Sequence, residues 1–217
     1  EREQKQELLA CRQQETVQKE PKKRLVSVNL KLDQVVQRTS ELNKIEIEGL
    51  LGNGFKQANF VPITSIRQEQ FLVKPNTIES LTHTFLVNNI ANEIRKLGGE
   101  PTIYLTVKPD IIFTNNKGEQ VAIEVETGIN FRKKKREHIE KFKRVQEEYG
   151  EHAVIVLTNS AYRRHYQHLL PNMKVLVRTQ VMAYLQACLT VYIGPKTGSA
   201  NGTKHRHKAP RRSEERR

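Results

Sequence analysis

The chain has little cysteine and no long apolar run, and each absence excludes a class of protein. Its only cysteines are Cys11 and Cys188. Two isolated thiols form neither a disulfide framework nor a zinc site, so the expected compartment is a reducing cytoplasm. The longest apolar stretch, 181–194, is interrupted by Gln186 and is too short to span a bilayer. No signal peptide and no glycine-rich phosphate loop are visible, which excludes a nucleotide-driven motor in this stretch.

Negative charge is also scarce relative to positive charge. The 217 residues include 37 Lys and Arg against 24 Asp and Glu, a net charge of +13. This excess favours a polyanionic partner, with nucleic acid ahead of an anionic membrane surface. The chain starts at Glu1 rather than at Met, so we expect it to be part of a longer protein.

Composition divides the chain into four segments. Residues 1–24 are mostly Glu, Gln, Lys and Arg, which predicts a solvated helix or linker. Residues 25–76 are mixed: a weak strand pattern and a possible short helix around Val35 precede three glycines that break regularity, so this region is unassigned. Residues 77–194 carry the regular patterns of a folded domain. The tail 195–217 has 8 Lys and Arg against 2 Glu, and we expect it to be basic and disordered.

Regular structure is expected from Thr77 onward, in the order helix, strand, strand, helix, strand, helix, strand. Apolar residues recur at helical spacing up to Gly98, and β-branched residues then dominate two runs separated by a turn. The pattern predicts an α/β fold with a mixed β-sheet flanked by helices. The expected elements are a helix at 77–97, strands at 102–113 and 120–127, a basic helix at 132–149, a buried strand at 153–159, a helix at 161–170, a strand at 175–179 and a helix near 180–187.

Three carboxylates are expected to meet on the predicted hairpin. Side chains alternate along a strand, so Glu124 and Glu126 share one face while Val121, Ile123 and Val125 share the other. The turn brings Asp110 back beside the two glutamates. Crowded carboxylates stay ionised only when a cation or basic groups offset their charge, and such oxygen ligands suit Mg²⁺ or Mn²⁺. The plainer alternative is a solvated strand face, which the flanking helices disfavour.

At these residues the chain resembles a known group. Pro109-Asp110, thirteen intervening residues and then Glu124-Val125-Glu126 are similar to the signature of the PD-(D/E)XK nuclease superfamily. Within it, EVETG followed by a basic helix is most similar to replication-relaxation-type proteins of plasmids and mobile elements, as is Thr82-His83 in the preceding helix. The resemblance covers roughly residues 77–180 and implies a restriction-endonuclease-like fold. It also implies that Asp110 and Glu124 are metal ligands, with the carbonyl of Val125 as a third.

The chain departs from the pattern at Glu126, where the superfamily usually has a lysine that positions water and stabilises charge. Two substitutes are conceivable: Lys135 or Lys141 reaches in from the next helix, or Glu126 becomes a further metal ligand. Each lysine also has an ordinary interpretation, because 132–149 carries 8 Lys and Arg and 4 Glu, and most of these must be solvated. A third outcome is a degenerate fold that binds DNA without cutting it.

Two further groups of residues enter the hypothesis. His83 shares a helix face with Val87 and Ile90, which favours a structural histidine over acid–base work at the metal site, whereas His138 and His165 are interpreted as surface residues. The basic run beside the carboxylates is interpreted as a phosphate-backbone contact surface, which gives affinity and little sequence specificity. Its members are Arg132, Lys133, Lys134, Lys135 and Arg136.

The sequence therefore supports three hypotheses. The first is a Mg²⁺- or Mn²⁺-dependent endonuclease or nickase that acts on DNA in plasmid replication or conjugative mobilisation. The second is an inactive nuclease-fold module that docks DNA within a larger conjugation or replication protein. The third is an RNA-binding or assembly factor, supported by basicity alone. The target site, strand preference and oligomeric state are not specified by the sequence.

Overall fold

The computed structural model describes residues 30–105, 108–127 and 135–190. They form a mixed α/β protein with two β-sheets, divided into two compact units at Asn88–Asn89, within helix α3 (Leu81–Lys96). The expected charged arm and basic tail lie outside these residues, as do Arg132, Lys133 and Lys134. Of the described helices, none is both long and apolar enough to cross a membrane.

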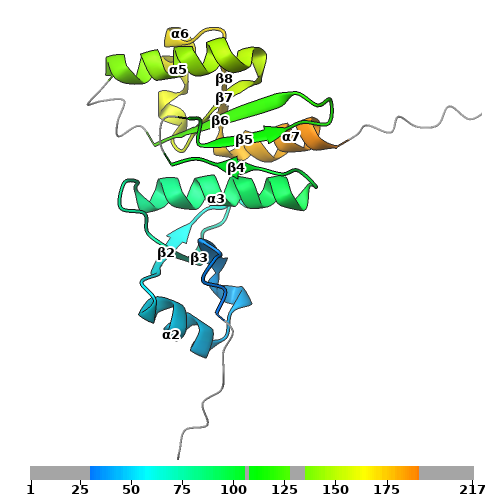
Figure 1. The fold of residues 1–217 in the computed structure, drawn as a ribbon. Helices are drawn as coiled ribbons and strands as arrows, with labels where there is room; N and C mark the ends of the chain where they lie inside the picture. The colour runs from blue at the N-terminus through cyan, green and yellow to red at the C-terminus, as the bar shows by residue number, and fades with distance from the viewer. Residues whose placement is uncertain (1–29, 106–107, 128–134, 191–217) are drawn as a thin grey trace, which may run out of the picture. The chain divides into compact units, whose positions relative to one another are not determined.

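Before α3, the N-terminal unit contains a small antiparallel sheet and helix α2, drawn in blue and cyan in Figure 1. The sheet has the strand order β1-β3-β2, and Leu72 of β3 and Phe55, the residue before β2, pack with Leu50 of the helix. The elements before α3 are β1 (Val36–Arg38), the 3-10 helix η1 (Thr39–Glu41), α2 (Lys44–Gly52), β2 (Lys56–Phe60) and β3 (Glu69–Val73).

Helix α2 forms where the sequence, because of its glycines, predicted no regular structure. Asn43 accepts a hydrogen bond from the backbone N–H of Glu46 at 3.0 Å, and the Glu46 carboxylate accepts one from the Asn43 backbone N–H at 2.8 Å. This reciprocal capping box starts the helix, and burial of Leu50 outweighs the intrinsic cost of the glycines. The possible short helix around Val35 was wrong, because Val36 begins strand β1.

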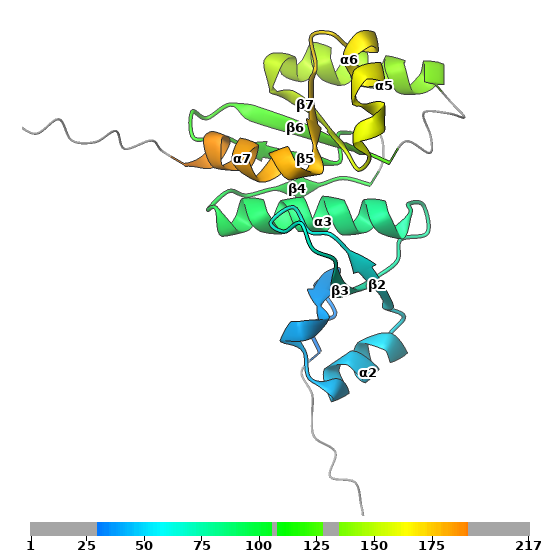
Figure 2. The ribbon, with the colours of Figure 1, turned by 180° about the vertical axis from the view of Figure 1, so that it is seen from behind.

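The C-terminal unit is a five-stranded sheet in the order β4-β5-β6-β7-β8. The pairs β4–β5 and β5–β6 are antiparallel, whereas the pairs β6–β7 and β7–β8 are parallel. Helices α5 and α6 cover one face of the sheet and α7 lies against the other (Figures 1 and 2). The elements are β4 (Thr102–Ile103), β5 (Ile111–Thr114), β6 (Gln120–Glu126), α5 (Lys135–Tyr149), η2 (Gly150–His152), β7 (Ala153–Leu157), η3 (Ser160–Tyr162), α6 (Arg163–Leu169), β8 (Lys174–Val177) and α7 (Arg178–Leu189).

From β5 onward the predicted order of elements in this unit is confirmed, because its apolar patterns match what the sheet buries. Every residue of β7 is buried, as expected for a central parallel strand covered on both faces. Phe142 and Val145 of α5 pack on Tyr166 of α6 and on Ala122 and Ile155 of the sheet. The predicted hairpin is also present, with Ile111 paired to Ile123 and Thr114 paired to Gln120.

Three predicted element boundaries were wrong. The strand expected over 102–113 is two strands, because Pro109 offers no backbone N–H to a ladder and the chain folds back, so that β4 pairs with β5. The first helix starts after Ser80 rather than after Thr77. The Ser80 hydroxyl accepts a hydrogen bond from the His83 backbone N–H at 3.2 Å and so caps the helix. The last helix is longer than predicted and spans Arg178–Leu189.

Replacing Gly118 with alanine should destabilise the C-terminal unit. Gly118 has a φ of +83° in the hairpin turn, and a Cβ there would meet nothing within 4 Å, so backbone strain is the whole cost. We expect a loss of about 1 kcal/mol in the free energy of unfolding, measured by chemical denaturation. Gly52→Ala is the matched control: its position is helical and equally open, so the same change should stabilise by roughly 0.5–1 kcal/mol. A neutral Gly118→Ala would contradict the assigned turn.

Candidate metal and acid–base site

The hairpin places two carboxyl groups side by side at one end of the sheet. Because β5 and β6 are antiparallel and Ile111 pairs with Ile123, Asp110 lies just before β5 at the level of Glu124. The Asp110 carboxylate accepts a hydrogen bond from the backbone N–H of Val125 at 2.7 Å. This end of β6 is also its carboxyl end in the parallel pairing with β7, the position where open α/β sheets usually bind ligands.

Burial makes the charge on this pair costly. The side chains of Asp110 and Glu124 are buried, and Glu124 is only 2% exposed. Burial, and after it the neighbouring charge of Asp110, raises the pKa of Glu124 to about 8, although Lys141 acts in the opposite direction. The two carboxyl groups are within hydrogen-bond reach of each other, a contact that requires a proton on one of them. At neutral pH the pair therefore holds a proton or needs a cation.

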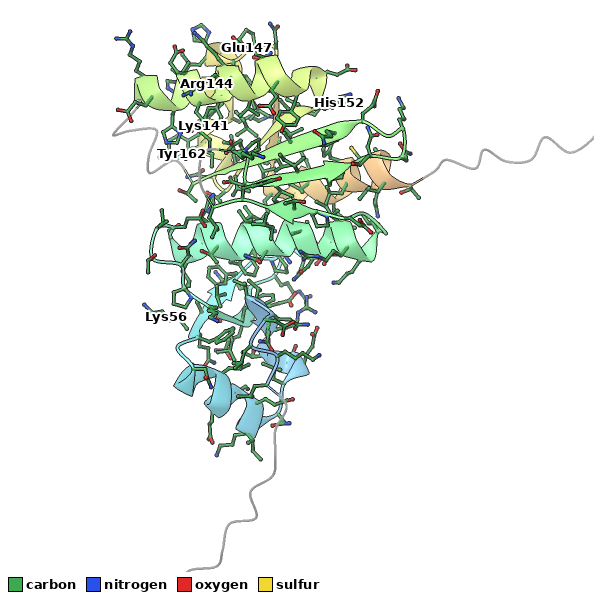
Figure 3. All side chains as sticks on the ribbon, in the orientation of Figure 1. Lys56, Lys141, Arg144, Glu147, His152 and Tyr162 are labelled. Atoms are coloured by element: carbon green, nitrogen blue, oxygen red, sulfur yellow. The ribbon has the colours of Figure 1, made fainter. Side chains whose placement is uncertain are left out.

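Lys141 supplies one positive charge from the helix that covers this face. Its Nζ lies 2.7 Å from Oε2 of Glu124, and the lysine side chain is 30% exposed. Figure 3 shows Lys141 on the sheet side of α5 and Glu147 on the far side. The other oxygen of Glu124, Oε1, is buried and accepts no hydrogen bond from the described residues. One acceptor of the pair is therefore left for a ligand.

Glu126 has different neighbours from Glu124. It is buried at 5% exposure, with Nδ1 of His138 3.5 Å from its Oε2. Burial, and after it the charge of the Glu126 carboxylate, raises the pKa of the Tyr166 hydroxyl on α6. Glu126 thus lies between α5 and α6, with His138 and Tyr166 as its side-chain neighbours.

The sequence interpretation of His138 as a surface residue was wrong. Its side chain is 17% exposed, lies beside Glu126 and packs on the ring of Phe142 with centroids 5.7 Å apart. A signal was present: His138, Lys141, Phe142 and Val145 recur at intervals of three and four residues and so share one face of α5. The basic composition of this helix concealed the polar part of its buried stripe. His165 is exposed, as expected.

The other predicted site residues are less central in the structure. Lys135 begins α5, and its side chain lies outside the described part. Arg136 is exposed. His83 belongs to the N-terminal unit, where its Nδ1 lies 3.0 Å from Oε2 of Glu79 on the preceding turn. Of the predicted catalytic residues, the structure therefore gathers Asp110, Glu124, Glu126 and Lys141 in one unit.

The donor set suits a hard divalent cation. Asp110 and Glu124 offer buried carboxylate oxygens at one point, and such oxygens are preferred ligands of Mg²⁺ and Mn²⁺. A cation held by Asp110 and Glu124 would replace the proton that the pair otherwise needs, and Oε1 of Glu124 is a buried acceptor without a hydrogen-bond partner in the described part of the chain. Lys141 could then turn from Glu124 toward a ligand of the metal, since its side chain is partly exposed.

The fold and this site define an α/β protein with a buried carboxylate pair and a lysine at one end of its larger sheet. No protein-family model, no curated protein and no solved structure matches the chain. The chemistry of the site is therefore the basis for its function.

The raised pKa of Glu124 predicts a pH-dependent stability in metal-free buffer. Glu124 has a pKa of about 8 in the folded protein against an ordinary 4.5, so the folded state holds the extra proton between these values. Its contribution is complete below the unfolded pKa and is lost as the pH rises through 8. Glu124→Gln should remove this loss and raise the unfolding free energy at pH 8.5 by on the order of 2 kcal/mol.

Glu147→Gln is the matched control, since Glu147 is exposed on the same helix that carries Lys141. It should leave the pH profile of thermal or chemical denaturation unchanged. If wild type and Glu124→Gln lose stability in parallel between pH 5 and 8.5, the pair does not share a proton as described.

Proposed function

We propose that the C-terminal unit is a divalent-metal-dependent nuclease core of the PD-(D/E)XK type that acts on DNA. The observation that carries this proposal is the buried Asp110–Glu124 pair, which has an unsatisfied carboxylate oxygen and a lysine 2.7 Å away. The order of elements supports it: a helix, an antiparallel hairpin, a covering helix and a parallel strand are what the resemblance requires around these residues.

Each group has a definite part in phosphodiester hydrolysis. Asp110 and Glu124 would hold Mg²⁺ or Mn²⁺, and the chemistry that such an ion would supply is charge neutralisation at the phosphate and acidification of water. Lys141 takes the part of the motif lysine that this chain lacks at Glu126: its ammonium would stabilise negative charge that develops on the phosphate. Water adds across one P–O bond: its oxygen bonds to phosphorus, the bond to the leaving oxygen breaks, and one proton passes to that oxygen.

The surroundings of Glu126 favour one of the two substitutes for the missing lysine. Glu126 is engaged by His138 and Tyr166, so it is held as a structural acceptor rather than as a third metal ligand. Lys141, in contrast, already reaches the carboxylate pair from α5. The same contacts favour the second candidate, a DNA-docking module without hydrolysis, if the Lys141–Glu124 ion pair never opens.

The net charge of +13 supports a nucleic-acid substrate, and a role in plasmid replication or conjugative mobilisation is what the resemblance implies. Basic residues near the carboxyl end of β6 would contact the phosphate backbone. Arg136 is the one of the predicted basic run whose side chain is described, and it is exposed as such a role requires.

Cleavage of supercoiled plasmid in Mg²⁺ or Mn²⁺ tests the proposal. Asp110→Asn and Glu124→Gln should abolish nicking, because each removes a metal ligand, and both should keep salt-sensitive DNA binding. Lys141→Met should reduce the rate by roughly 100-fold or more, the usual loss when a group stabilising transition-state charge is removed. Lys143→Ala is the control, since Lys143 is half-exposed on the same helix and pairs with Glu140.

An intact plasmid after long incubation with either metal would contradict the enzyme hypothesis and would favour the DNA-docking module. Cleavage that survives both Asp110→Asn and Glu124→Gln would place the chemistry elsewhere. A preference for RNA over DNA in direct competition would favour the third hypothesis, an RNA-binding or assembly factor.

A further inference from the structure

Arg163 has a buried side-chain nitrogen, Nε, that forms no hydrogen bond with the described residues. It is the first residue of α6 and is partly buried. Its Nε is shielded from solvent and donates to no acceptor among the described residues, and within the same part of the chain its guanidinium forms no ion pair. A buried charged donor without an acceptor is costly, and in a native protein it calls for an explanation such as a bound ion.

The position of Arg163 connects it with the carboxylate site. Arg163 precedes Tyr166 by three residues, so the two side chains share a face of α6. Tyr166 is fully buried and packs in one core cluster with Phe142 of α5 and Leu157 at the carboxyl end of β7. Arg163 also follows the carboxyl end of β7, whose last residue Leu157 pairs with Glu126. The guanidinium therefore belongs to the same end of the sheet as Asp110 and Glu124.

The surrounding sequence offers Arg163 no negative partner. From His152 to Ser213 the chain contains no Asp or Glu, whereas it includes Arg163, Arg164, Lys174 and Arg178 within the described residues. On α5 the situation differs, because Lys141 pairs with Glu124 and Lys143 pairs with Glu140. The half of the unit from β7 to α7 thus presents only positive charge beside an acidic site.

We propose that Arg163 binds a backbone phosphate of DNA next to the carboxylate pair. Arginine suits this task because its planar guanidinium presents several donors that match phosphate oxygens in pairs. A phosphate on the partly exposed guanidinium would balance its charge and would be placed at the end of the sheet where the metal ligands lie. This assignment rests on the proposed function in its choice of DNA as the ligand, but it requires no hydrolysis.

Arg164 provides a matched control within the same helical turn. It carries the same charge but is exposed, so its guanidinium is solvated. The measurement is fluorescence anisotropy of the full chain with a short DNA duplex in EDTA, over a series of salt concentrations. Arg163→Gln should weaken binding about tenfold and lower the slope of log affinity against log salt by about one, as for the loss of one phosphate contact. Arg164→Gln should weaken binding by no more than about twofold.

Thermal denaturation separates this role from a structural one. Since Arg163 has no acceptor among the described residues, Arg163→Gln should leave the melting temperature of the DNA-free protein unchanged or raise it. Arg163→Lys keeps the charge but loses the paired donors, so its affinity should fall between those of wild type and Arg163→Gln.

Equal affinities of wild type and Arg163→Gln would overturn the assignment. So would a melting temperature that falls in Arg163→Gln without DNA, because that result means the guanidinium has a structural acceptor. Failure of the nuclease proposal gives a different pattern: the plasmid stays intact in Mg²⁺, while the affinity loss on Arg163→Gln in EDTA remains.

Discussion

The site depends on the cost of burying two carboxyl groups together. Asp110 and Glu124 lie at the same end of the hairpin with little exposure, and that burial raises the pKa of Glu124 to about 8. Two carboxyl groups that are buried side by side require a proton, a basic side chain or a cation to offset their charge. The ammonium of Lys141 and the backbone N–H of Val125 offset part of this cost, and the remaining acceptor is what makes the site a candidate for metal.

Helix α5 connects that electrostatic requirement with the packing of the sheet. Its buried stripe is polar at His138 and Lys141, which meet Glu126 and Glu124, and apolar at Val145, which packs with Ala122. His138 and Lys141 are three residues apart on the helix, and their partners Glu126 and Glu124 are two residues apart on the strand. The two pairs therefore follow one another along β6, from its carboxyl end toward the core. A change in the charge of the carboxylates therefore acts directly on the helix that covers them.

Much of the C-terminal unit could be predicted from the sequence, because its apolar patterns are strong. The hairpin, the buried strand β7 and the stripe of α5 follow from periodicity, and so does the meeting of Asp110 with Glu124. The position of Lys141 was one of two alternatives. The choice of Lys141 over Lys135 depends on the angle at which α5 crosses the sheet, which periodicity does not specify.

The features that the sequence did not predict have physical causes. Residue type alone assigned His138 to the surface, although its helical position faces Glu126. Helix α2 was missed because the glycines hid a capping box at Asn43. Arg163 was not selected because a missing ion pair is visible only when the neighbours of a side chain are known. The restriction-endonuclease-like fold and DNA as substrate stay predictions.

The most direct test of the account is a crystal structure of the chain grown with Mn²⁺, with data collected for anomalous scattering. We predict one anomalous peak between the carboxylates of Asp110 and Glu124, with Lys141 turned away from Glu124. A structure in millimolar Mn²⁺ without a peak at these residues, with Lys141 still paired to Glu124, would contradict the metal site.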